Sequence, residues 1–209
     1  MKRTFVIAGM ALIMMILAGC APKVMVPPKV DLINYEVVGL VELESNSRGD
    51  FSPYVTQRFL EAISEDQPGV MIVELGKAND LLAELGMNTL GPEALKALGE
   101  KFNLNTIFTG NLDFAEPSTK ITGFPTVSSM GVQVKVSTVL TVRLRDVHTG
   151  ATLWTASARD EREIAGVGWN AGFFHFDAED PDRAYGKMAE KLVRDVSKDY
   201  RVTYVRQKR

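Results

Sequence analysis

The two histidines are the side chains best suited to acid–base chemistry in this sequence of 209 residues. His148 lies in a predicted turn, and His175 lies in a stretch rich in glycine and aromatic residues. A serine hydrolase needs a histidine held between a serine and an acid, and the G-x-S-x-G sequence that often presents this serine is absent. If the chain were a hydrolase, His175 would have to be its catalytic histidine. The sequence therefore favours a protein that is not an enzyme.

An acidic run follows this histidine and offers oxygen ligands for a metal ion. Its carboxylates belong to Asp177, Glu179, Asp180 and Asp182. The run lacks the central glycine and the closing glutamate of an EF-hand loop. A helix is predicted to begin at Pro181, so the acids are better explained by the positive end of its dipole. We expect neither a metal nor another cofactor here.

Residues 166–176 combine glycines with four aromatic residues, Trp169, Phe173, Phe174 and Phe176. The glycines lack the G-x-G-x-x-G spacing of a dinucleotide-binding loop, and no Walker lysine accompanies them. Aromatic side chains dominate protein cores and also anchor interfaces. Two interpretations therefore stay open. The aromatic residues either fill the core beneath the last helix or form a contact surface for a neighbouring subunit or for lipid headgroups.

Cys20, the one cysteine of the chain, ends a segment with the features of a bacterial leader. Lys2 and Arg3 precede an apolar run over residues 5–17, which is shorter than the ~20 residues of a transmembrane helix. Residues 17–20, Leu-Ala-Gly-Cys, resemble a lipobox, which implies cleavage before the cysteine and lipid on its sulfur. The alternative is an uncleaved anchor with an incidental cysteine.

Charge and the residue after the cysteine refine this prediction. Position 21 is alanine rather than aspartate, which in the usual sorting pattern favours the outer membrane. Loss of residues 1–19 removes two positive charges and no acids, so the formal net charge changes from −2 to −4. An acidic body is not drawn to an anionic bilayer, so acyl chains such as palmitate would hold it there. The same charge argues against a nucleic-acid partner.

The strongest structural signal is the alternation of apolar and polar residues over 132–145. A turn rich in polar residues follows at 146–150, and alternation resumes from residue 152 into a charged stretch at 159–163. A period of two places successive side chains on opposite faces of a strand. The pattern predicts a β-hairpin with one apolar and one polar face. The residues of the apolar face are Val132, Val134, Val136, Thr138, Leu140, Val142 and Leu144.

Other strands and helices surround this hairpin in the order β-α-β-α-α-β-β-β-α. Strands are expected at 35–42, 70–74 and 106–115, the last with a bulge at Gly110. Helices are expected to begin at Ser52-Pro53, Asn79, Pro92 and Pro181, and the third is expected to end at Asn103. We predict an α/β (α+β) fold, a single domain with a mixed β-sheet, a long antiparallel hairpin and helices packed on it.

The connecting segments are less well defined by the sequence. Residues 21–29 hold three prolines and are expected to form an extended tether. Residues 30–33 either continue this tether or form a short edge strand. Residues 116–131 are expected to be a long loop or a loose hairpin arm. The basic tail, residues 201–209, either adds an edge strand or stays unpaired.

Two segments resemble the curli-secretion lipoproteins of the CsgG type. They are Leu98-Gly99 with Leu104-Asn105-Thr106-Ile107-Phe108-Thr109-Gly110, and Val142-Arg143-Leu144-Arg145-Asp146-Val147-His148-Thr149-Gly150 with Trp154. The resemblance extends over residues 35–200. It implies a lipid-anchored periplasmic domain, related to the N-terminal fold of TolB, that assembles into rings. Proteins of this kind serve in curli secretion, exopolysaccharide export and activation of peptidoglycan synthesis.

The sequence thus predicts a signal peptide at 1–19, an acylated cysteine and tether at 20–34, and a folded domain at 35–200, followed by the tail. The expected function is that of a non-enzymatic outer-membrane lipoprotein facing the periplasm. It would form a homo-oligomer and work with other envelope proteins in assembly, secretion or export. The alternative is a monomeric regulatory or binding lipoprotein that activates a peptidoglycan or polysaccharide synthase.

Overall fold

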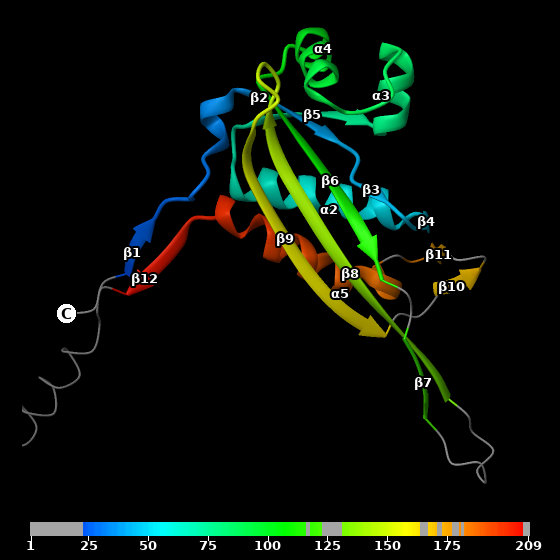
Figure 1. Ribbon diagram of the computed structural model, residues 1–209. Helices are drawn as coiled ribbons and strands as arrows, with labels where there is room; N and C mark the ends of the chain where they lie inside the picture. Colours follow the sequence, from blue (N-terminus) through cyan, green and yellow to red (C-terminus); the bar gives the residue numbers. More distant parts are fainter. Residues whose placement is uncertain are drawn as a thin grey trace, which may run out of the picture.

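The computed structural model describes residues 23–206, apart from residues 116–117, 123–130, 164–166, 171–172, 177–179 and 181. The predicted signal peptide and Cys20 lie outside the described residues. The chain forms a single domain in which helices pack on both faces of a mixed β-sheet (Figure 1). The predicted fold class is confirmed.

The sheet joins parallel and antiparallel strands. In spatial order, five of its strands are β5 (Met71–Gly76), β2 (Val37–Val41), β6 (Thr106–Phe114), β8 (Gly131–Asp146) and β9 (Thr152–Glu163). β2 is parallel to β5 and β6, whereas β8 pairs antiparallel with β6 and β9. Two further strands extend the sheet: β3 (Glu44–Ser45) pairs with β6, and β7 (Ser118–Thr122) pairs with β8.

β8 and β9 form the predicted hairpin, and every second residue of β8 from Val136 to Leu144 is buried. The turn is held by Asp146, whose Oδ1 accepts hydrogen bonds from the backbone N–H groups of His148 at 3.1 Å and Thr149 at 2.7 Å. Gly150 closes the turn with a φ of 70°. A short side chain that caps backbone donors and a glycine at positive φ are typical of such turns.

The bulge expected at Gly110 is absent, because the pairing of β6 with β8 continues through this residue without a shift. A glycine is needed here instead because β6 and β8 approach each other closely at this position. A Cβ atom at this position would lie 2.5 Å from the backbone oxygen of Thr141 on β8.

Helices cover both faces of the sheet. α2 (Phe51–Asp66) and α5 (Lys187–Val196) pack with β2, β6 and β8 around the larger core, where Phe59 meets Phe108 edge to face at 5.2 Å. α3 (Ala78–Leu85) and α4 (Pro92–Phe102) pack on the opposite face in a second cluster. α4 begins at Pro92 and ends before a left-handed Asn103, as predicted.

Two helices begin earlier than the sequence predicts. α2 starts at Phe51, and the Ser52 hydroxyl donates a hydrogen bond to the Leu43 carbonyl instead of capping the helix. α3 starts at Ala78, so Asn79 lies inside its first turn. Ser52 therefore does not cap α2, because its hydroxyl bonds to a preceding loop instead. The local sequence does not reveal this contact.

Two segments with no clear strand pattern contain strands. β7 supports the hairpin-arm interpretation of residues 116–131 over the long loop. Within residues 166–176, where the sequence predicts no strand, β10 (Val167–Asn170) and β11 (Phe173–Phe176) pair antiparallel. β11 also runs parallel to the short strand β4 (Arg48–Gly49). Aromatic residues favour strands, and this preference prevails over the neighbouring glycines.

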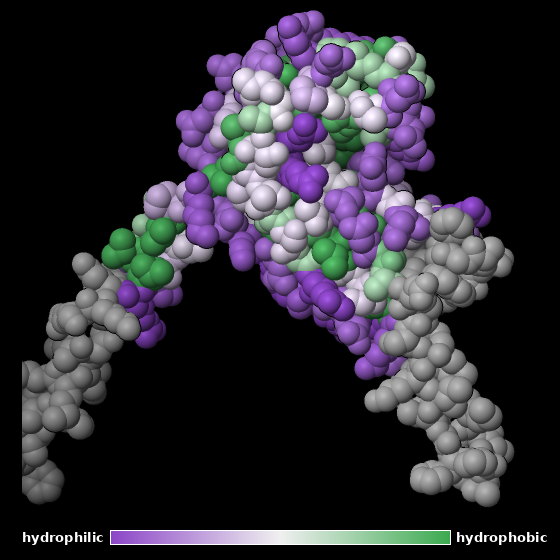
Figure 2. Space-filling view, viewed as in Figure 1, coloured by the Kyte–Doolittle hydropathy of each residue, from purple (hydrophilic) through white to green (hydrophobic). Residues whose placement is uncertain are grey.

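The two ends of the described chain form a separate ribbon. β1 (Lys23–Val26) pairs antiparallel with β12 (Thr203–Arg206), so these residues of the expected extended tether are paired in a strand, and the tail does add a strand. The ribbon stands clear of the helices and the sheet, and its apolar surface is exposed (Figure 2). Next along the chain, η1 (Leu32–Tyr35) is a 3₁₀ helix rather than an edge strand or a tether.

Candidate interaction site

The four aromatic residues singled out in the sequence lie on the β10–β11 hairpin. Trp169 is in β10, whereas Phe173, Phe174 and Phe176 are in β11. Trp169 pairs with Phe174, and Val167 pairs with Phe176. Asn170 pairs with Phe173 at the turn end of the hairpin.

The hairpin is attached to the body on its β11 side. His175 and Phe176 pair with Arg48 and Gly49 of β4. Only Asp50 separates β4 from the start of α2. The backbone of the hairpin therefore pairs with the short strand that leads into the N-terminal end of α2.

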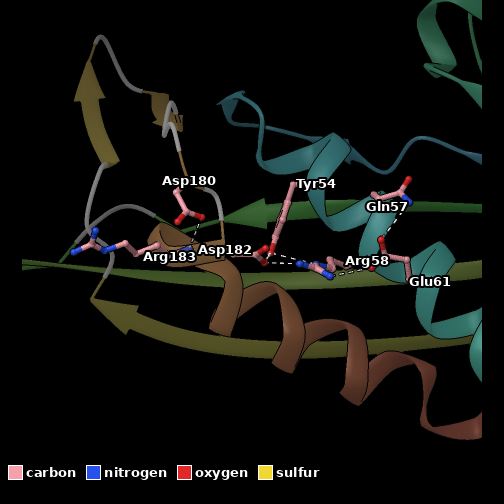
Figure 3. Close-up of polar contacts among 7 residues, drawn as sticks. All are labelled: Tyr54, Gln57, Arg58, Glu61, Asp180, Asp182 and Arg183. Atoms are coloured by element: carbon pink, nitrogen blue, oxygen red, sulfur yellow. Dashed lines mark hydrogen bonds and ion pairs between the residues drawn. The ribbon is translucent and has the colours of Figure 1, made fainter.

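Further along the chain, the π-helical turn η2 (Asp182–Gly186) meets α2 (Figure 3). The Asp182 carboxylate accepts hydrogen bonds from the Tyr54 hydroxyl and the Arg58 guanidinium. Arg58 Nε also donates to the Tyr54 oxygen at 3.2 Å, and Arg58 Nη1 pairs with Glu61 at 3.0 Å. Beneath these polar contacts the Tyr185 ring of η2 meets the Tyr54 ring edge to face at 5.2 Å.

The charges of this cluster stabilise one another. Hydrogen bonds from Tyr54 and Arg58 hold the pKa of the Asp182 carboxyl below its ordinary value. Partial burial and the hydrogen bond to Asp182 raise the pKa of Tyr54. Hydrogen bonds to Tyr54 and Asp182 raise the pKa of Arg58. Asp182 is therefore ionised and Tyr54 neutral at pH 7, which is the state that this arrangement of donors and acceptors requires.

The acidic run is in part the helix cap that the sequence suggests. Asp180 Oδ1 accepts a hydrogen bond from the backbone N–H of Arg183 at 3.2 Å, and its backbone oxygen accepts one from Ala184 at 3.1 Å. Asp177 and Glu179 lie outside the described residues. Among the residues that are described, no three of His, Cys, Asp and Glu are grouped so as to hold a metal ion.

An open groove of about 370 Å³ lies beside the cluster, between α2 and α5. Its wall carries both signs of charge. The charged residues that line it are Arg58, Glu61, Glu65, Asp182, Lys187 and Glu190.

The sequence did not single out Tyr54 and Arg58. Their spacing of four residues, with Glu61 three further on, places all three on one side of α2. This spacing was a usable signal for a polar cluster. Their common partner, Asp182, is 124 residues from Arg58, so no local pattern could identify it.

The described helices include none that is both long and apolar enough to cross a bilayer.

Comparison with known proteins gives similarity of structure only. The sequence matches no protein-family profile and no curated protein. A PelC dodecamer from Paraburkholderia phytofirmans matches with a TM-score of 0.48 at 12% identity, over 86% of this chain and 98% of that one. The C-terminal domain of LpoB from Salmonella enterica matches with a TM-score of 0.39 at 13% identity, over 61% of this chain and 84% of that one. Lipoprotein GNA1162 from Neisseria meningitidis matches with a TM-score of 0.39 at 16% identity, over 65% of this chain and 88% of that one.

Proposed function

We propose that this chain is a non-enzymatic lipoprotein of the bacterial envelope that binds and regulates another envelope protein. The observation that carries the proposal is the leader ending in Leu-Ala-Gly-Cys, followed closely by a folded domain. Acylation of Cys20 would fix this domain to the periplasmic face of the outer membrane. The partners that the sequence resemblance implies are peptidoglycan and polysaccharide synthases.

The composition of the surface supports a body that is stable without an obligate subunit. Its core residues are buried within the single chain, several with no exposed surface. Among the described residues outside the β1–β12 ribbon and its neighbour Val202, only three large apolar side chains are exposed, Ile33, Met71 and Leu153, and they belong to different elements. Obligate subunit interfaces are large and apolar, which such scattered residues do not provide.

The β10–β11 hairpin is the contact surface that we assign to the partner. Its strand β11 pairs with β4. The chain after β11 leads to η2, which Tyr54, Arg58 and Asp182 join to α2. A surface that is held in place before it binds loses little conformational entropy. The charged groove between α2 and α5 adjoins the Asp182 cluster and would add polar contacts.

The proposal is tested in cells by mass spectrometry and photo-crosslinking. We expect the mature protein to begin at Cys20 and to carry acyl chains. A photoreactive phenylalanine analogue at Phe174 should give a crosslink to a second protein, whereas the same analogue at Phe102 on α4 should not. A retained leader would disprove the anchor. A lack of crosslinks at Phe174 would disprove the assigned surface.

A second candidate is the oligomeric assembly or export component that the sequence resemblance implies. The observation in its favour is the long edge of the sheet, since β9 has twelve residues and pairs with β8 alone among the described strands. An edge of this length can accept a strand from a neighbouring copy. The molecular mass in solution separates this candidate from the regulator.

A further inference from the structure

The β1–β12 ribbon is the most apolar exposed surface of the described chain. Six of the nine large apolar side chains that this part exposes lie on the ribbon or next to it: Val24, Met25, Val26, Val202, Tyr204 and Val205. Met25 is 59% exposed and Tyr204, which pairs with it, is 65% exposed. A two-stranded ribbon is at best marginally stable in water. We therefore expect another surface to pack against the apolar side chains of the ribbon.

The base of the ribbon is fixed to the body. The backbone N–H groups of Lys29 and Val30 donate to the Asp199 carbonyl at 2.9 and 3.1 Å. The Lys29 ammonium also pairs with the Asp199 carboxylate at 2.9 Å. Pro27 and Pro28 lie between this base and β1 and restrict the backbone there. The ribbon therefore leaves the domain from a defined point.

The position of the ribbon in the chain points to a lipid surface. Its first residue, Lys23, is three residues after Cys20, and three extended residues span at most about 11 Å. If Cys20 carries acyl chains, the ribbon lies against the bilayer. The same follows for an uncleaved leader, whose apolar run ends at residue 17.

The charge of the ribbon fits anionic headgroups. Lys23 pairs with Arg206 at the end nearer Cys20. The segments 21–30 and 201–209 contain six basic residues and no acid, although the mature chain is acidic as a whole. Two of the six, Lys29 and Arg201, pair with Asp199 and Asp66, which leaves four basic residues toward the ends of the chain. Basic residues beside a bilayer contribute about 1 kcal/mol each, and tyrosine is enriched at the headgroup level.

From these features we infer that the β1–β12 ribbon is a second membrane contact, which lies in the headgroup region of a bilayer containing anionic phospholipid. It would set the orientation of the domain beneath the membrane, because a rigid ribbon limits rotation about a single lipid anchor. The inference rests on the anchor in the proposed function.

Hydrogen exchange of the whole mature chain, residues 20–209, tests the inference independently of acylation in cells. The Cys20 thiol is coupled to a maleimide lipid in vesicles of phosphatidylethanolamine and phosphatidylglycerol. We expect the amides of β1 and β12 to exchange about tenfold more slowly than in the thiol-capped chain without vesicles, as burial of a few apolar side chains implies. Unchanged exchange would overturn the inference and leave the proposed function intact.

Matched variants identify what covers the ribbon. M25S/Y204S should lose most of this protection, whereas M71S/L153S, which removes exposed apolar side chains of the body, should retain it. Equal protection in both variants would contradict the inference. Protection of the same amides without vesicles at high protein concentration would assign the ribbon to a second copy of the chain, and this too would overturn it.

Discussion

Gln67 is a buried amide that connects three segments far apart in the sequence. Its Oε1 accepts a hydrogen bond from the Leu32 N–H at 3.1 Å, and its Nε2 donates to the carbonyls of Val30 at 3.3 Å and Tyr200 at 2.6 Å. These contacts tie the end of α2 to η1 and to η3 (Ser197–Tyr200). The same side chain thus fixes both segments from which the β1–β12 ribbon leaves the body.

The variant Gln67→Ala should lower the free energy of unfolding by about 2 kcal/mol, because it leaves a buried N–H and two carbonyls without their partner. Urea denaturation measures the change. Gln57→Ala is the matched control, since Gln57 is exposed and bonds only to Glu61 on the same helix, and it should shift stability by less than about 0.5 kcal/mol. Equal effects of the two variants would contradict the role given to Gln67.

At the scale of elements, the attachment of η2 to α2 depends on the charge of Asp182. A carboxyl group whose pKa is lower in the folded state stabilises the fold above its unfolded pKa of about 4, and this contribution is lost as the pH falls through the folded value. Asp182→Asn should therefore unfold at a lower urea concentration than the wild type at pH 7. The difference should shrink towards pH 3.

Glu190→Gln provides the control for this pH dependence. Glu190 pairs with Arg194 at 3.6 Å on the exposed side of α5, and an exposed pair of this kind contributes little. Its denaturation midpoint should stay close to that of the wild type at both pH values. A deficit of Asp182→Asn that is the same at pH 7 and pH 3 would show that lost packing, rather than lost charge, causes the effect.

Elements that depend on short-range patterns could be predicted from the sequence, and those that depend on distant partners could not. The alternation of β8 and the proline and asparagine at the ends of α4 were sufficient signals. The β1–β12 ribbon and the β4–β11 pair join segments more than a hundred residues apart, and their strands have two to four residues each. Periodicity cannot identify strands so short, because they contain only one or two repeats.

At the scale of the whole molecule, the regulator and the oligomeric component differ in mass. We expect the mature chain carrying Cys20→Ser to be a monomer by light scattering over a wide range of concentration. If it instead forms a ring through the aromatic hairpin, W169A/F173A should reduce the mass to that of one chain, because aromatic anchors supply most of an interface's binding energy. A ring whose mass the double variant leaves unchanged would show that the aromatic hairpin is not the interface.

The pairing of Lys23 with Arg206 brings the two ends of the described chain to one place. If Cys20 carries the proposed lipid, a fluorescent protein or affinity tag fused after Arg209 would lie beside that lipid and would compete with the bilayer for space. The β8–β9 turn lies at the top of the domain in Figure 1, away from the ribbon, and its residues His148 and Thr149 are exposed. An epitope inserted there would report on the protein without disturbing its approach to the lipid.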